Sequence, residues 1–116
     1  MSAQPACLAA DVATGEALRV ELVGERGPVA VAVVRDDDGA LHAISDVCSH
    51  GAVSLSDGDV EGRTIECWLH GSRFDLRTGA ALGLPATHHV PVYHVTVDGE
   101  HVLVDVDVVH RPSEEN

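Results

Sequence analysis

The sequence predicts a single all-β domain. A chain of 116 residues is long enough for one hydrophobic core and too short for two. Val supplies nineteen residues, whereas Phe, Trp and Tyr supply one each. Such a β-branched core favours strands over helices. Eleven Gly and five Pro add turns, and no segment keeps a helical period over three turns.

Short apolar or alternating runs, bounded by turn residues, place the strands in order. The predicted strands are Leu18–Val23, Pro28–Val34, Leu41–Ser45, Thr64–Cys67, Arg73–Leu76, Val90–Val97 and Val102–Val108. The run from Pro28 is continuously apolar, which indicates a more buried strand. The last two runs alternate around Asp98-Gly99, a dipeptide typical of a tight hairpin.

Three further segments are assigned from local composition. Asp36-Asp37-Asp38-Gly39 predicts a solvated turn rather than a carboxylate site. Cys7 lies among alternating small apolar residues and is expected to be a buried or half-buried thiol on an early strand. The polar residues after Val108 are expected to fray, so the domain is assigned to residues 1–108 and a tail to 109–116.

The charge balance limits the partners. Nineteen acidic residues against seven Arg and no Lys give a formal net charge of −12. This field repels nucleic acid and anionic membranes, so we expect neither as a partner, and it favours a protein with a basic docking patch. No signal-peptide pattern or membrane-spanning run is present, and three Cys do not suggest a disulfide framework, so a cytoplasmic location is expected.

Two short elements carry potential metal ligands. Cys48-Ser49-His50-Gly51 and Cys67-Trp68-Leu69-His70-Gly71 each offer one thiolate and one imidazole. Two Cys and two His are the ligand set of a Rieske [2Fe–2S] centre, in which a His pair replaces a Cys pair on one iron. Zinc accepts the same donors, but structural zinc sites usually pair Cys with Cys and His with His. A Cys nucleophile with a His base is the third alternative, although no orienting third residue is visible.

The stretch Cys67-Trp68-Leu69-His70-Gly71-Ser72-Arg73-Phe74-Asp75, together with Cys48-Ser49-His50-Gly51 and Thr78-Gly79, resembles Rieske-type ferredoxins of non-haem iron oxygenase systems. The resemblance runs from about Cys7 to Asp107. It implies a β-sandwich with a two-loop subdomain that binds one [2Fe–2S] cluster. It further implies that Cys48 and Cys67 hold the buried iron and that His50 and His70 hold the outer iron.

Departures from the cytochrome bc Rieske pattern narrow the resemblance. Val53 and Leu69 stand where those proteins have a disulfide, and Phe74 stands where they have a Tyr near a cluster Cys. Ser72 matches a Ser that can hydrogen-bond a bridging sulfide. Because fewer hydrogen bonds to sulfur disfavour the more negative reduced state, we expect a potential near the lower end of the Rieske range, roughly −150 mV.

Other residues beside the ligands have expected supporting roles. Gly51 and Gly71 permit tight turns beside the cluster sulfurs. Trp68 is expected to pack beside the cluster and exclude water, and Pro85 resembles a proline loop that covers it. We expect the remaining histidines to lie away from the cluster, with four of them on strand surfaces. Those four are His42, His94, His101 and His110.

The expected function is one-electron transfer without substrate chemistry. The resemblance implies a flavin-dependent reductase as donor, an oxygenase or other redox protein as acceptor, and a monomer with transient partners. The stretch around Cys67 with Gly83-Leu84-Pro85-Ala86-Thr87 also resembles Rieske proteins beside iron–sulfur assembly machinery in actinobacteria. A non-redox subunit with the same fold, as in some nitrite reductases, is the alternative from another class.

Overall fold

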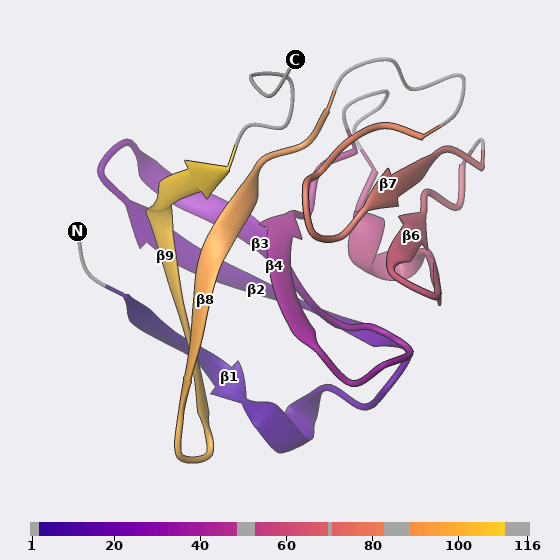
Figure 1. Ribbon diagram of the computed structural model, residues 1–116. Helices are drawn as coiled ribbons and strands as arrows, with labels where there is room; N and C mark the ends of the chain where they lie inside the picture. The colour runs from indigo at the N-terminus through magenta and orange to yellow at the C-terminus, as the bar shows by residue number, and fades with distance from the viewer. Residues whose placement is uncertain (1–2, 49–52, 70, 83–88, 111–116) are drawn as a thin grey trace.

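The computed structural model describes residues 3–48, 53–69, 71–82 and 89–110. Within these residues the chain forms nine strands and two short 3₁₀ turns (Figure 1). The strands are β1 (Gln4–Leu8), β2 (Glu16–Gly24), β3 (Gly27–Arg35), β4 (Leu41–Ser45), β5 (Asp59–Glu61), β6 (Thr64–Glu66), β7 (Arg73–Asp75), β8 (Val92–Asp98) and β9 (His101–His110). The 3₁₀ turns are η1 (Ala9–Asp11) and η2 (Leu55–Asp57).

Six strands form one antiparallel sheet in the order β1-β9-β8-β4-β3-β2. This sheet curls so that its two edge strands, β1 and β2, approach each other. The side-chain amide of Gln4 links them, because its nitrogen donates to the Val23 carbonyl at 2.8 Å and its oxygen accepts from the Val23 N–H at 3.2 Å. The amide thus occupies backbone groups that an open sheet edge would leave exposed.

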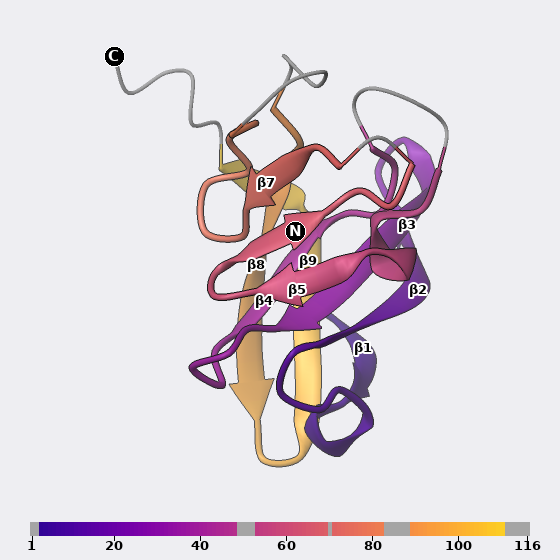
Figure 2. The same ribbon diagram turned by 90° about the vertical axis from the view of Figure 1, so that its right-hand side faces the viewer.

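The other three strands form a small sheet in the order β5-β6-β7, which lies against the β3–β4 part of the larger sheet (Figures 1 and 2). Strand β3 contributes side chains to both apolar clusters, one on each of its faces. Ala32 and Val34 face the small sheet, whereas Val31 and Val33 face the interior of the large one, and all four are completely buried. A strand buried on both faces reads as an unbroken apolar run, as this one does.

The acidic turn between β3 and β4 ties the two sheets together. Asp37 accepts from the Gly62 N–H at the β5–β6 turn and donates its own N–H to the Gly62 carbonyl at 3.1 Å. Asp38 pairs with Arg63 at 3.3 Å. The predicted turn is confirmed. The prediction that the turn is exposed to solvent is wrong for Asp36, which is 1% exposed.

The burial of Asp36 also corrects the expectation for His42. The imidazole lies 2.8 Å from the Asp36 carboxylate and its side chain is only 12% exposed, so it is not a strand-surface residue. Burial disfavours the charged carboxylate, but hydrogen bonds from His42 and from the Ala40 and Asp38 N–H groups outweigh it, and the pKa of Asp36 is lowered.

The predicted fold class is confirmed: the protein is all-β, with two packed sheets. Each predicted strand is present, with ends that differ by up to two residues, and Leu41–Ser45 agrees at both ends. Cys7 lies half-buried on β1, as expected. The strand Asp59–Glu61 was not predicted, because three residues between two turns carry too little pattern.

Candidate metal centre

The first ligand element begins where β4 ends. An isolated bridge pairs Val47 with Ser54, and the N–H of Cys48 donates to the Val53 carbonyl at 3.1 Å. These contacts close a loop whose first residue is Cys48. Residues 49–52, which include His50 and Gly51, lie outside the described residues.

The second ligand element has the same closure. The N–H of Cys67 donates to the Ser72 carbonyl at 2.7 Å, so a bond again joins a cysteine to the fifth residue after it. The Gly71 N–H donates to the Cys67 carbonyl at 2.9 Å, and Gly71 has a φ of +77°, a conformation that L side chains rarely adopt. His70 lies outside the described residues.

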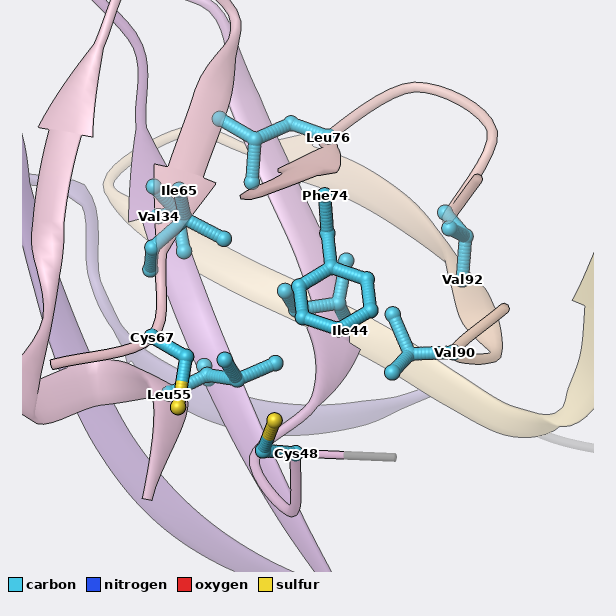
Figure 3. Close-up of a cluster of buried hydrophobic side chains, with 11 residues drawn as sticks. Val34, Ile44, Cys48, Leu55, Ile65, Cys67, Phe74, Leu76, Val90 and Val92 are labelled. Atoms are coloured by element: carbon cyan, nitrogen blue, oxygen red, sulfur yellow. The ribbon is translucent and has the colours of Figure 1, made fainter. Parts of the chain in front are cut away.

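The two loops place two thiols at one end of a buried cluster. Cys48 is 3% exposed and Cys67 is 1% exposed, and both belong to the apolar cluster between the sheets. Figure 3 shows both sulfur atoms at the same end of that cluster, below Ile65 and Phe74. Neither cysteine is in a disulfide. Two buried thiols on separate loops fit the two-cysteine half of a Rieske site.

The remaining predicted ligands fall outside the described ranges, so the full set is not seen together. Within the described part of the chain, no three His, Cys, Asp or Glu side chains gather as a metal site. Pro85 and His88 lie outside the described residues as well.

Phe74 and Ser72 are buried beside the thiols. Phe74 is completely buried on β7, and its ring points from that strand toward the end of the cluster that carries the sulfurs (Figure 3). Ser72 is 1% exposed and lies at the closing bond of the second loop. Val53 packs partly buried against the cluster, and Leu69 is exposed.

Trp68, which is expected to pack beside the cluster, is 55% exposed in the described part of the second loop. Val47, Leu69 and Leu82 are also large, exposed and apolar. Val47 directly precedes the first ligand loop, Leu69 lies in the second, and Leu82 lies in the segment that follows β7. We call Val47, Trp68, Leu69 and Leu82 the apolar rim.

A buried carboxylate that the sequence analysis did not identify holds the first loop. Asp46 is 1% exposed and accepts from the Ser56 N–H at 2.8 Å and from the Arg19 Nε at 3.1 Å. Its backbone carbonyl accepts from the Leu55 N–H at 2.7 Å. An acidic residue at the end of an apolar strand, two positions before a predicted ligand, was the available signal.

The second loop has a more exposed counterpart. Arg73 on β7 pairs with Glu61 on β5 at 2.9 Å and with Glu66 on β6 at 3.4 Å, so one guanidinium spans the small sheet. Arg77 Nε lies 3.8 Å from the Asp75 carboxylate, which is a long ion pair. His89 Nδ1 accepts from the Ala81 N–H at 3.1 Å.

The comparisons with known proteins agree with this geometry. The family described as the Rieske [2Fe–2S] domain matches residues 2–94. The chain belongs to the Rieske [2Fe–2S] domain family. As a Rieske protein it carries a [2Fe–2S] cluster, whose chemistry is the uptake and release of single electrons.

Several of the relatives are ferredoxins of dioxygenase systems. The chain is 43% identical over 101 residues to the ferredoxin component of the p-cumate 2,3-dioxygenase system of Pseudomonas putida, covering 86% of this chain and 82% of that protein. The ferredoxin of carbazole 1,9a-dioxygenase from Nocardioides aromaticivorans IC177 superposes with a TM-score of 0.81 at 36% identity, covering 90% and 98%. A chain in a complex of reduced oxygenase and oxidized ferredoxin in carbazole 1,9a-dioxygenase superposes with a TM-score of 0.76 at 36% identity. The match covers 87% of this chain and 99% of that chain.

These relatives confirm the expectation that this Rieske protein is an electron carrier without catalytic chemistry of its own. Among the residues that the structure describes, no helix is long and apolar enough to cross a membrane.

Proposed function

We propose that this Rieske protein binds its cluster through Cys48, His50, Cys67 and His70, and that it carries electrons from a flavin-dependent reductase to an oxygenase. The two thiolates would hold the inner iron and the two imidazoles the outer one. Gly51, Gly71, Ser72 and Phe74 would surround the sulfurs, and Pro85 would cover the cluster.

The observation that carries this proposal is the matched pair of loops. Cys48 and Cys67 each open a loop closed by a bond to the fifth following residue, and both thiols lie buried at one end of the core. In the sequence, His50 and His70 each fall between the cysteine and the closing residue of its loop. A scattered pair of core cysteines would not be expected to begin two loops of equal closure.

The apolar rim supports an acceptor that docks at the cluster end. Four of the seven large apolar side chains that are exposed in the described residues belong to this rim. Exposed apolar side chains near a redox centre suit a small, transient interface of the kind that electron-transfer partners form. The relatives named above serve dioxygenases, which favours an oxygenase as the acceptor.

Electron paramagnetic resonance of the dithionite-reduced protein tests the ligand assignment. We expect a Rieske signal in the wild type and in His94→Ala, which alters an exposed histidine. We expect its loss in single substitutions to Ala at His50 and His70 and to Ser at Cys48 and Cys67. A colourless, silent wild type containing stoichiometric zinc, or no metal, would contradict the proposal and favour the zinc or non-redox subunit alternatives.

The electron path needs a separate measurement. Reduction of the protein by an NADH-dependent flavin reductase, followed by oxidation on mixing with an oxygenase, would support both partners. Trp68→Ala should slow the second step while leaving the cluster signal unchanged, because Trp68 lies on the rim. Reoxidation only by iron–sulfur assembly proteins would move the acceptor to that class.

The remaining assignments are also proposals. We place the protein in the cytoplasm. We also propose that it is a monomer, and sedimentation of the holoprotein would test the monomeric state. The cluster domain is proposed to include residues 1–108 and to be followed by a frayed tail, although β9 itself continues to His110. Removal of residues 111–116 should leave the cluster signal and the unfolding temperature unchanged.

A further inference from the structure

Asp46 fastens both limbs of the first ligand loop. On the incoming limb its N–H donates to the Ala30 carbonyl of β3 at 3.0 Å. On the outgoing limb its carbonyl accepts from Leu55 and its carboxylate accepts from Ser56. One residue therefore ties the start of the loop, the end of the loop and the neighbouring strand.

The carboxylate of Asp46 is a charge held at a fixed place. Its side chain is 1% exposed, and the Arg19 Nε that donates to it comes from β2 with a side chain 49% exposed. The carboxylate of the pair is thus shielded from water, whereas the guanidinium is half exposed to solvent. Solvent screens an exposed charge far more than a buried one, so the electric field of Arg19 in the core does not fully cancel that of Asp46.

The charge also lies near the site where an electron is added. Asp46 is two residues before Cys48 in the sequence, and two extended residues span at most about 7 Å. We propose that Asp46 is a positioning residue that also lowers the reduction potential of the cluster, with Arg19 as its partial counterweight. This inference rests on cluster binding by Cys48 as proposed above.

The molecule contains a matched control. Asp36 is a second carboxylate that is 1% exposed; it accepts from two backbone N–H groups and from His42, whereas the Asp46 carboxylate accepts from one backbone N–H group and from Arg19. It stands before β4, whereas Asp46 follows it, so the five residues of that strand separate the two carboxylates by roughly 17 Å. Asp36→Asn and Asp46→Asn remove the same charge from equally buried positions at different distances from Cys48.

Redox titration of the holoproteins tests the proposal. At an effective dielectric constant near 20, a unit charge about 10 Å away changes a one-electron equilibrium on the order of tenfold. We therefore expect Asp46→Asn to favour reduction by about that factor, and Asp36→Asn to change the equilibrium by about threefold or less. Arg19→Gln should disfavour reduction, and the double variant Asp46→Asn/Arg19→Gln should lie between the two single ones.

An electrostatic role predicts opposite shifts of the reduction potential for Asp46→Asn and Arg19→Gln. A purely structural role predicts shifts in the same direction, because both substitutions would loosen the loop. Equal potentials for Asp46→Asn and Asp36→Asn, or shifts of one sign for Asp46→Asn and Arg19→Gln, would overturn the proposal.

If Asp46→Asn fails to retain iron, the half-exposed Arg19→Gln decides alone. A potential lower than that of the wild type supports the proposal, and an unchanged one overturns it. Absence of a cluster signal in every protein, wild type included, would instead be a failure of the proposed ligand set.

Discussion

The ring of Phe74 and the thiol of Cys48 lie in the same buried cluster, although one comes from the small sheet and the other from the end of β4. Phe74→Tyr would bring a hydroxyl toward the sulfurs. A hydroxyl that donates to a cluster sulfur stabilises the more negative reduced state, so the potential should rise above the wild-type value, which we expect near roughly −150 mV. Redox titration measures both. Phe74→Leu, which adds no donor, should lose stability without the same rise, and a Tyr variant with the wild-type potential would contradict the argument.

The backbone of Gly58 lies very close to the backbone of Glu66, just before the second ligand loop. A Cβ at Gly58 would overlap the carbonyl group of Glu66, the residue before Cys67, although the backbone of Gly58 is extended and unstrained. Gly58→Ala should therefore lower the unfolding temperature and the iron content together. Gly62→Ala is the control, because its φ is +62° but nothing lies within 4 Å of its Cβ. That variant should cost about 1 kcal/mol through backbone strain and keep its iron. Equal iron loss in both would show that overlap at Glu66 is not the cause.

The Asp36–His42 pair predicts a pH-dependent difference in stability. The lowered pKa of Asp36 means that its charged form is favoured by folding, so its contribution is complete above the unfolded-state pKa of about 4 and is lost as pH falls through the lower folded value. Asp36→Asn should be about 2 kcal/mol less stable at neutral pH. The difference between the two proteins should shrink below about pH 4. Urea unfolding at several pH values measures it, and a constant difference across that range would be evidence against this origin.

Cys7 should be an unreactive thiol that plays no part in the cluster. Burial and the nearby carboxylate of Asp11 raise the pKa of Cys7, which the positive charge of Arg35 only partly opposes. Less thiolate is then present at neutral pH, so alkylation by iodoacetamide should be slower than that of a small free thiol and should accelerate above pH 9. Cys7→Ser should keep the Rieske signal and the potential. Rapid modification at neutral pH would contradict this account.

The sequence predicted the strands well where the apolar pattern was long. The run from Pro28 to Val34 indicated a buried strand because both faces of β3 are covered. It could not reveal that the two faces belong to different layers. The brief strand β5 escaped notice because its stability comes from pairing with β6 and not from its own pattern.

At the site, the ligand types and spacing predicted the loops, and the structure added their closure. Electrostatic partners were harder to foresee. Asp46 and Arg19 are joined across strands that are remote in sequence, and the buried state of Asp36 depends on His42 on the next strand. The exposure of Trp68 on its loop could not be read from its position between Cys67 and His70.

The two-sided burial of β3 has a consequence for protein engineering. The loops that begin at Cys48 and Cys67 are short and look portable, yet the floor beneath them is a strand whose other face completes the larger sheet. Transplanting the loops alone would leave out Ala32 and Val34, and transplanting β3 with them would leave Val31 and Val33 without the rest of the larger sheet that covers them. A working graft of this electron-transfer unit must therefore carry both sheets.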